Sequence, residues 1–215
     1  MSYEDKEILN IFKKKGKYFL NKSIWGLGIV TGDNKNKLSS ICLKGMEKIY
    51  TGKEIQKYIL KSAKNYIYFD RNNLQQVAKD EIYRAEEKLV YKFISNKLTF
   101  AYDNTKSLFL NSANILIPFI PSMCIKSILA FLNSTLFQFA YIKLFGEIKI
   151  LKGNLLELPF PEIFKETDNT ISSSVNKILN GNNSEIKNID SYIFSIYNYS
   201  ATQIEYIKRS VYKNN

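Results

Sequence analysis

Basic and amide side chains gather in four short polar stretches that lie between apolar runs of the sequence. Proteins that read duplex DNA use Arg and Lys at guanine edges and Asn and Gln at adenine edges, and they meet phosphates with Lys, Ser, Thr and backbone N–H groups. We therefore predict that these stretches form loops that bind DNA. The candidate residues are Asn34, Lys35, Asn36 and Lys37; Lys44 and Lys48; Arg71, Asn72, Asn73, Gln75 and Gln76; and Lys97, which follows Ser95 and Asn96, with Arg84 as a further candidate.

Two of these candidates, Arg71 and Arg84, stand out because most other cations in the chain are lysines. A guanidinium presents a rigid fork that binds guanine or phosphate through two hydrogen bonds, which an ammonium cannot do. We predict that Arg71, with amide side chains beside it, contacts DNA bases. For each lysine the simpler alternative is a solvated surface charge.

A second hypothesis is that the chain is a small nuclease. Metal-dependent nucleases of one large class hold Mg²⁺ with two acids and place a lysine beside it. Glu86 and Lys88 have the required E-x-K spacing, and Asp70 lies upstream. The simpler interpretation is a solvated Glu86 at a helix end and a Lys88 that opens a strand. A basic module that binds RNA or protein is a third hypothesis.

Charge and composition favour a polyanionic partner. The chain of 215 residues has a formal net charge of +11, and residues 1–100 hold 20 Lys and Arg against 11 Asp and Glu. Such a basic half on a folded protein is typical of nucleic-acid binding. Since there is no histidine, Ser-His-Asp and Cys-His nucleophiles, a histidine base and the usual zinc sites are excluded.

The two cysteines, Cys42 and Cys124, are far apart and have no metal-ligand spacing, so we expect two reduced structural thiols. The N-terminus has no apolar signal core, and no window approaches the roughly 18 apolar residues of a membrane span. The sequence therefore predicts a cytoplasmic, soluble protein without a membrane partner.

The stretch Ile125–Pro161 is expected to position the rest of the chain. Its apolar residues recur every three or four positions up to Gly146, which predicts one buried helix face. Residues Glu147–Ile150 then alternate as a half-buried strand does, and Pro159 and Pro161 close the unit. The apolar positions of the helix are Ile125, Leu129, Leu132, Leu136, Ala140 and Leu144.

Other elements follow from periodicity and turn residues. A short helix is expected over Glu4–Phe12, with a basic turn at Lys13–Lys17. A capping box at Ser200 and Gln203 predicts a helix start. Strands are expected over Ile24–Thr31, Lys37–Lys44, Tyr66–Asp70, Lys88–Phe93, Leu98–Asp103 and Leu108–Pro118, and further helices over Ala78–Glu86, Ser172–Asn183 and Ile189–Tyr197.

Five motifs in order resemble the TaqI-like C-terminal specificity domain, the target-recognition domain of adenine-N6 DNA methyltransferases and fused restriction–modification enzymes. The family's second motif forms a helix, which the resemblance places after Tyr50. The matching residues are Gly28–Asn34; Gly52, Glu54, Ile55 and Tyr58; Tyr66–Phe69; Glu87–Leu89 with Lys97 and Ala101–Asp103; and Leu132–Thr135 with the Leu155–Pro161 exit.

The resemblance implies an α+β fold: a mixed or antiparallel, β-rich recognition domain with a long packed helix and a C-terminal helical tail. It divides the chain into an N-terminal helix or linker from an upstream domain (1–23), the specificity domain (24–163) and the tail (164–215). It further implies sequence-specific recognition of double-stranded DNA within a type II, type IIG-like enzyme.

The catalytic half of such an enzyme is missing from these residues. Neither the N/D-P-P-Y/F/W loop that holds the target adenine nor a Gly-rich cofactor loop occurs. The chain is therefore predicted to be non-catalytic. S-adenosylmethionine and Mg²⁺ are expected only in the methyltransferase and nuclease domains of the parent enzyme, which would be its protein partners.

Overall fold

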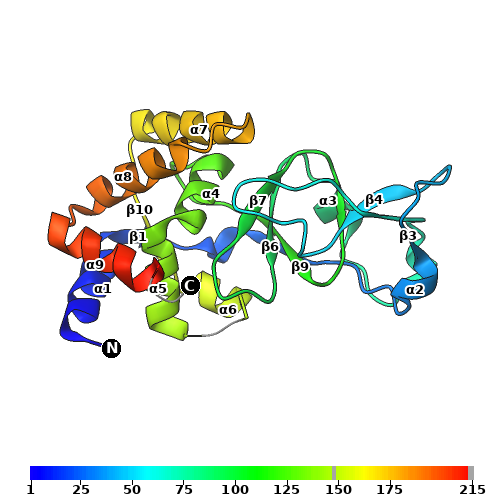
Figure 1. Cartoon of the computed structure of the whole chain (residues 1–215), viewed down its shortest axis with the longest axis horizontal. Coiled ribbons are helices and arrows are strands. Elements are labelled where there is room, and N and C mark those ends of the chain that lie inside the picture. The colour runs from blue at the N-terminus through cyan, green and yellow to red at the C-terminus, as the bar shows by residue number, and fades with distance from the viewer. Residues whose placement is uncertain (147–148, 213–215) are drawn as a thin grey trace.

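Two lobes lie along the long axis of the molecule (Figure 1). The computed structural model describes residues 1–146 and 149–212. Helices form one lobe, on the left of Figure 1, and short strands form the other, on the right. The chain thus has an α+β fold, as the sequence predicts.

A central antiparallel sheet joins the two lobes. Its strand order is β2 (Ile24–Leu27), β9 (Ala113–Ile117), β6 (Lys88–Lys92), β7 (Phe100–Asp103). Alternate residues of β6 point to opposite faces, so Leu89 and Tyr91 join the helical core while Val90 joins the core of the β lobe. Because both faces are covered, the strand is buried along almost its whole length.

A second sheet packs on the far face of the first. Its order is β3 (Leu38–Ser39), β5 (Asn65–Ile67), β4 (Glu47–Tyr50), β8 (Leu108–Phe109), and only the β4–β8 pair is parallel. Three single-turn helices connect these strands and carry much of the polar surface. They are α2 (Asn34–Lys37), the 3₁₀ helix η2 (Arg71–Asn73) and α3 (Asp80–Tyr83).

The helical lobe is built around two buried helices, α4 (Ile125–Asn133) and α5 (Thr135–Phe145). The N-terminal helix and the three helices of the tail pack around this pair (Figure 1). The surrounding elements are α1 (Tyr3–Lys15), β1 (Gly16–Tyr18), η1 (Leu20–Lys22), α6 (Lys152–Leu156), β10 (Phe160–Pro161), α7 (Lys165–Leu179), α8 (Glu185–Tyr197) and α9 (Ala201–Tyr212), with β1 paired to β10.

Side chains at the break between α4 and α5 tie the helical lobe to the central sheet. Asn133 accepts from the Phe100 N–H at 3.0 Å and donates to the Phe100 carbonyl at 2.9 Å. Gln138 accepts from the Leu98 N–H at 2.6 Å, and Lys57 donates to the Asn133 carbonyl. The N–H groups of Phe100 and Leu98 thus find acceptors in the helical lobe, while the Phe100 carbonyl also accepts from the Tyr58 N–H at 2.7 Å.

Asp5 holds α1 against the rest of the helical lobe. Its carboxylate closes the capping box with Ser2, forms an ion pair with Lys143 at 2.9 Å, and accepts from the Tyr206 hydroxyl at 3.1 Å. Burial alone would raise the pKa of Asp5, but the donors from Lys143, Ser2 and Tyr206 outweigh burial and hold the pKa below its usual value.

The structure corrects several element boundaries. The helix predicted from Ile125 is divided at Ser134, whose backbone is extended and whose hydroxyl caps α5 by accepting from the Phe137 N–H. The two helices meet at a 60° bend. Periodicity alone missed the break because apolar residues continue on both sides of it.

The helix expected after Tyr50 is wrong. Residues 51–54 form turns instead, and Tyr58 has a positive φ of 73°, which no helix allows. The long strands expected at Lys37–Lys44 and Leu108–Pro118 are shorter or divided, and the basic turn at Lys13–Lys17 begins inside α1. In the predicted strand Glu147–Ile150, Glu147 and Ile148 lie outside the described residues.

The predicted capping box is confirmed. The Ser200–Gln203 capping box is formed in both directions, at 3.3 and 3.0 Å, and α9 follows it. Both cysteines are free. Within residues 1–146 and 149–212 no single helix is long and apolar enough to cross a membrane; only α4 and α5 taken together pass that test, and both are buried in the core.

Candidate nucleic-acid interface

A groove of about 900 Å³ opens on the β lobe and collects cations and amides from five separate segments. Its lysines come from the turn after β4, the start of β5 and the end of β6. The residues that give it polar character are Lys53, Lys64, Lys92, Asn34, Asn65 and Asn111. None of the three lysines pairs with a carboxylate within the described part of the chain.

Close backbone contacts fix the floor of the groove. The Gly52 N–H donates to the Ser112 hydroxyl at 2.9 Å, and the Phe93 N–H donates to the Ser112 carbonyl at 3.1 Å. A Cβ at Gly52 would lie 2.8 Å from that carbonyl, so this contact requires glycine. The turn after β4 and the end of β6 are therefore held together, which brings Lys53 and Lys92 into one groove.

The carboxylate among the groove residues, Glu54, is turned inward. It is only 4% exposed and accepts from the Thr51 N–H at 2.8 Å and the Thr51 hydroxyl at 2.7 Å. The Glu54 carboxylate therefore stabilises the turn that carries Lys53. The solvent side of the groove is left with positive charge and neutral amides.

Three apolar residues, Phe93, Ile94 and Leu110, also line the groove. Of these, Ile94 is 64% exposed and Leu110 is buried. An apolar wall beside amides and lysines suits a ligand that offers flat or methylated surfaces between phosphates, such as the bases of a nucleic acid. The groove can thus provide lysines for phosphates, amides for the edges of bases and an apolar surface for their faces.

The first and third predicted stretches meet beside this groove. Lys37 donates to the carbonyls of Thr31 and Asn73, so it links α2 to η2 through backbone atoms. Asn34 lines the groove and accepts from the Thr31 hydroxyl at 2.6 Å. Lys35, Asn36, Asn72, Asn73, Gln75 and Gln76 are exposed around this junction.

Both arginines that the sequence singled out are held within the chain. Arg84 binds Glu47 with both arms of its fork, at 2.7 and 2.8 Å, and lies over the Phe69 ring. The Glu47 hydrogen bonds, the largest contribution, raise the pKa of Arg84. Arg71 forms an ion pair with Asp80 and donates to the Ala78 carbonyl at 2.9 Å.

The remaining predicted cations are spread over the β lobe. Lys44 is exposed on the loop between β3 and β4, and Lys48 is exposed on β4. Lys97 lies on the β6–β7 connection next to Leu98, which bonds Gln138 of the helical lobe. The structure therefore brings Asn34 into the groove, places Lys35 and the η2 amides beside it, and leaves Lys97 apart from them.

Five of the six lysines and asparagines of the groove were not predicted: Lys53, Lys64, Asn65, Lys92 and Asn111. Lys53 lies where a helix was expected, and Lys92 lies inside a predicted strand. Their signal in the sequence was the excess of lysine itself, since single lysines at strand ends look like ordinary surface charges. Only the folded arrangement puts them together.

The residues of the nuclease hypothesis do not form a metal site. Lys88 is fully buried, where it pairs with Asp103 at 2.5 Å and donates to the Tyr83 carbonyl at 2.7 Å. Glu86 is 84% exposed and pairs with Lys106, while Asp70 caps η2. In the described ranges no three His, Cys, Asp or Glu side chains could jointly hold a metal ion.

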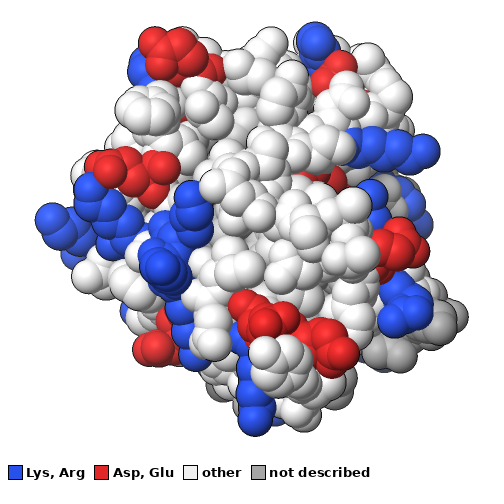
Figure 2. Space-filling model, turned by 90° about the vertical axis from the view of Figure 1, so that its left-hand side faces the viewer, with Lys and Arg blue, Asp and Glu red and all other residues white. Residues whose placement is uncertain are grey.

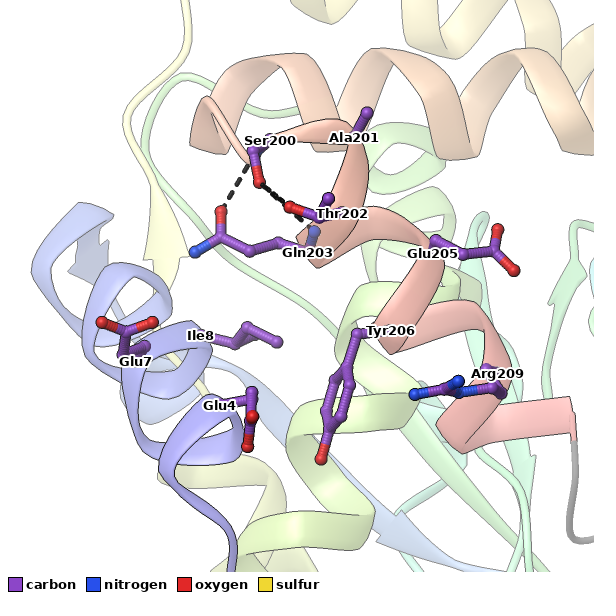
Figure 3. Close-up of a pocket in the computed structure, with 10 residues that line it drawn as sticks. All are labelled: Glu4, Glu7, Ile8, Ser200, Ala201, Thr202, Gln203, Glu205, Tyr206 and Arg209. Atoms are coloured by element: carbon purple, nitrogen blue, oxygen red, sulfur yellow. Dashed lines mark hydrogen bonds between the residues drawn. The ribbon is translucent and has the colours of Figure 1, made fainter.

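The opposite end of the molecule has a different character. Figure 2 faces the helical lobe and shows cations and anions mixed around an uncharged centre. A cavity of about 650 Å³ lies there between α1 and α9 (Figure 3). Three carboxylates, Glu4, Glu7 and Glu205, and one guanidinium, Arg209, line it, so it does not suit a polyanion.

A family comparison accounts for the arrangement of the β lobe. The model of the TaqI-like C-terminal specificity domain matches residues 47–160, more than half of the chain. The chain belongs to this family. The matched range runs from β4 through strands β6, β7 and β9 of the central sheet to Phe160, and it includes five of the six lysines and asparagines of the groove. No curated protein sequence matches the chain.

Solved structures with a similar fold share little sequence with this specificity domain. The HsdS subunit from Thermoanaerobacter tengcongensis has a TM-score of 0.51 at 11% identity, over 97% of this chain and 49% of that chain. A structure on complex assembly and conformational transition of the type I R-M system gives 0.50 at 10% identity, over 97% and 50%. The type IIL restriction-modification enzyme MmeI in complex with DNA gives 0.49 at 13%, over 89% and 33%.

These likenesses concern the fold. The chain spans between a third and a half of the length of those proteins. The likeness extends over both lobes, because the two matches with TM-scores of 0.51 and 0.50 each cover 97% of this chain.

Proposed function

We propose that this specificity domain recognises double-stranded DNA in a sequence-specific way and forms the non-catalytic recognition part of a type II restriction–modification enzyme. The methyl transfer to the N6 atom of adenine, and any cleavage, would be performed by methyltransferase and nuclease domains that bind S-adenosylmethionine and Mg²⁺. The division at residues 23 and 163 into linker, recognition domain and tail is part of the proposal.

The observation that carries the proposal is the composition of the groove on the β lobe. Three lysines without carboxylate partners in the described chain surround three asparagines and an apolar wall. Lysines meet phosphates without regard to sequence, whereas asparagine binds an adenine edge through two hydrogen bonds. One groove therefore offers both affinity and a means of choosing bases.

The predicted loop residues supplement the groove. Asn34 lines it, and Lys35, Asn72, Asn73 and Gln75 lie beside it on α2, η2 and the following loop, where they extend the polar surface. Lys44 and Lys48 extend the positive charge toward the end of the β lobe. In this proposal Lys37 and Arg84 act by holding loops in place, through the Asn73 carbonyl and through Glu47 respectively, and Arg71 does so through Asp80.

Selection of bound sequences from random duplexes tests the proposal. The purified chain should enrich one short motif, and Asn34→Ala with Asn111→Ala should relax the choice of adenine within it, because each lost bidentate contact is worth about 1–3 kcal/mol of discrimination. Asn169→Ala, an exposed change on α7 of the helical lobe, is the matched control and should leave the motif unchanged.

Three outcomes would contradict the proposal. Enrichment of no motif at moderate salt would remove sequence-specific recognition. Equal affinity for RNA and for duplex DNA would favour the general basic module instead. Cleavage of plasmid DNA by the chain, abolished by Glu86→Ala, would restore the nuclease hypothesis.

A further inference from the structure

The loop between β3 and β4 lies at the far end of the β lobe (Figure 1). It carries large apolar side chains that are exposed to solvent. Ile41 is 68% exposed and Leu43 is 51% exposed, and the neighbouring Tyr68 is 50% exposed. Large aliphatic side chains so exposed and so close in sequence are uncommon on a protein surface that binds nothing. Neither Ile41 nor Leu43 belongs to the hydrophobic core of either lobe.

Local hydrogen bonds hold this loop in an extended, outward position. At its start, the Ser39 hydroxyl donates to the Ile41 carbonyl at 2.6 Å and accepts from the Ile41 N–H at 3.0 Å. At its end, the Met46 N–H donates to the Leu43 carbonyl at 3.0 Å across a turn in which Gly45 has φ of +86°. That positive φ favours glycine. The apolar tips are thus preorganised.

The charges around the loop suit a polyanion. Lys44 lies within the turn itself, and Lys48 follows on β4; both are exposed. The one acid of this segment, Glu47, is occupied by the fork of Arg84. An apolar tip flanked by lysines matches a duplex, whose stacked bases lie between two rows of phosphates.

The loop and the groove belong to the same sheet. Lys64 and Asn65 line the groove at the start of β5, and the strand leads to Tyr68, whose ring lies 3.5 Å from the position of a Cβ at Gly45. The four residue steps from Lys64 to Tyr68, at about 3.3 Å for each step of an extended chain, span about 13 Å, comparable to the width of a DNA groove. One duplex can therefore touch both sites.

We propose that Ile41 and Leu43 form an apolar wedge that inserts between base pairs of the bound duplex and kinks it. This inference rests on the proposed recognition of duplex DNA. Apolar side chains that enter a base step unstack it and bend the helix, and the lost stacking is offset by contacts that the bent duplex makes with a larger protein surface. Here that surface is the groove.

The double variant Ile41→Ser/Leu43→Ser tests the wedge on the selected duplex, at a length of about 30 base pairs. Fluorescent labels at the duplex ends report bending through energy transfer, and 2-aminopurine placed step by step reports unstacking. The wild-type chain should bend the duplex and raise 2-aminopurine fluorescence at one step. The variant should lose both signals and bind about tenfold or more weakly, because two buried apolar side chains are removed from the complex.

The matched control is Phe164→Ser/Tyr192→Ser, which removes two exposed apolar side chains from the helical lobe. It should bind and bend DNA as the wild type does, and both variants should keep the wild-type unfolding midpoint. Wild-type-like bending and affinity of the Ile41→Ser/Leu43→Ser variant would overturn the wedge alone and assign the loop to a protein contact. Failure of the wild-type chain to bind any duplex would overturn the proposed function together with it.

Discussion

The two lobes of this specificity domain use their charged residues in different ways. In the β lobe, acids are occupied by partners within the chain: Glu47 by Arg84, Asp103 by Lys88 and Glu54 by Thr51. The lysines of the groove are left facing solvent. On the helical lobe, acids and cations alternate over the surface (Figure 2), and the cavity between α1 and α9 is lined by carboxylates.

The net charge of the chain therefore does not by itself locate a binding surface. The 31 Lys and Arg of the chain are spread over both lobes. What distinguishes the groove of the β lobe is that the one acid lining it, Glu54, is buried, whereas its three lysines form no ion pair within the described residues, so that a field of one sign remains there. Such a field attracts a polyanion over a distance of about a Debye length, roughly 8–10 Å at physiological salt.

The largest effect is expected at the buried ion pair of the β lobe. Asp103→Ala removes the partner of Lys88, whose ammonium would then be buried without a counter-charge. We expect the free energy of unfolding to fall by about 3–5 kcal/mol, measured by urea denaturation. The double variant Lys88→Met/Asp103→Leu should recover most of the loss. A loss below about 1 kcal/mol for Asp103→Ala would show that the ion pair contributes little to the stability of the β lobe.

The connection between the lobes should give the next largest effect. Asn133→Ala leaves the N–H and the carbonyl of Phe100 without their side-chain partner in a buried site. We expect a loss of about 2–3 kcal/mol in the free energy of unfolding. Asn188→Ala, an exposed change on α8, should cost no more than about 0.5 kcal/mol. Equal costs would mean that the Asn133 contacts do not join the lobes.

Within the helical lobe, Asp5 offers a pH-dependent comparison. Asp5→Asn should lower stability by about 2 kcal/mol at neutral pH, because the ion pair with Lys143 is lost in a largely buried site. Since the pKa of Asp5 is lowered in the folded state, its contribution is present above the unfolded pKa and is lost as the pH falls through the lower, folded value.

The difference between the wild type and Asp5→Asn should therefore shrink below about pH 4, as thermal unfolding at a series of pH values would reveal. Glu7→Gln on the exposed side of α1 removes the same charge and serves as the control. A difference that stays constant down to strongly acidic pH would exclude the linkage to this carboxylate.

The smallest effect is expected at Glu47. Glu47→Gln frees the fork of Arg84 on the β lobe, at a cost of about 0.5–1 kcal/mol in stability because the pair is partly exposed. Duplex affinity should rise slightly, since one acid is removed near the positive surface. Glu86→Gln, which disturbs the exposed Lys106 pair, is the control for charge alone. Lower affinity of Glu47→Gln would mean that Arg84 must be held to keep the surface intact.

Local signals in the sequence predicted much of the helical lobe. The capping box at Ser200 and the periodicity of Ile189, Ile193 and Ile196 depend on residues close in sequence, and α8 and α9 formed as expected. The break at Ser134 was harder to predict, because a residue that can cap a helix was set in a continuous apolar run. The cause of the break is a tertiary contact, because the Asn133 side chain must reach Phe100 of β7.

The β lobe was less predictable because its strands are short and pair over long distances. Strand β4 has one partner at residues 65–67 and another at 108–109, and neither pairing leaves a local signal. The helix expected after Tyr50 failed for the same reason, since the contact of Gly52 with Ser112 replaces local hydrogen bonds. The groove residues were hard to predict for the same reason. Asn34 was predicted, whereas Lys53, Lys64 and Lys92 were not.

We propose that the groove of the β lobe, and not the charge of the chain as a whole, binds duplex DNA. Lys53→Gln/Lys64→Gln/Lys92→Gln and Lys6→Gln/Lys187→Gln/Lys208→Gln each remove three charges, the first from the groove and the second from the exposed surfaces of α1, α8 and α9. The measurement is the slope of log K for duplex binding against log salt concentration. The groove variant should lose about 2–3 from the magnitude of that slope, since each phosphate contact contributes about 0.9, and the helical variant should keep the wild-type slope. Equal slopes for the two variants would contradict the account.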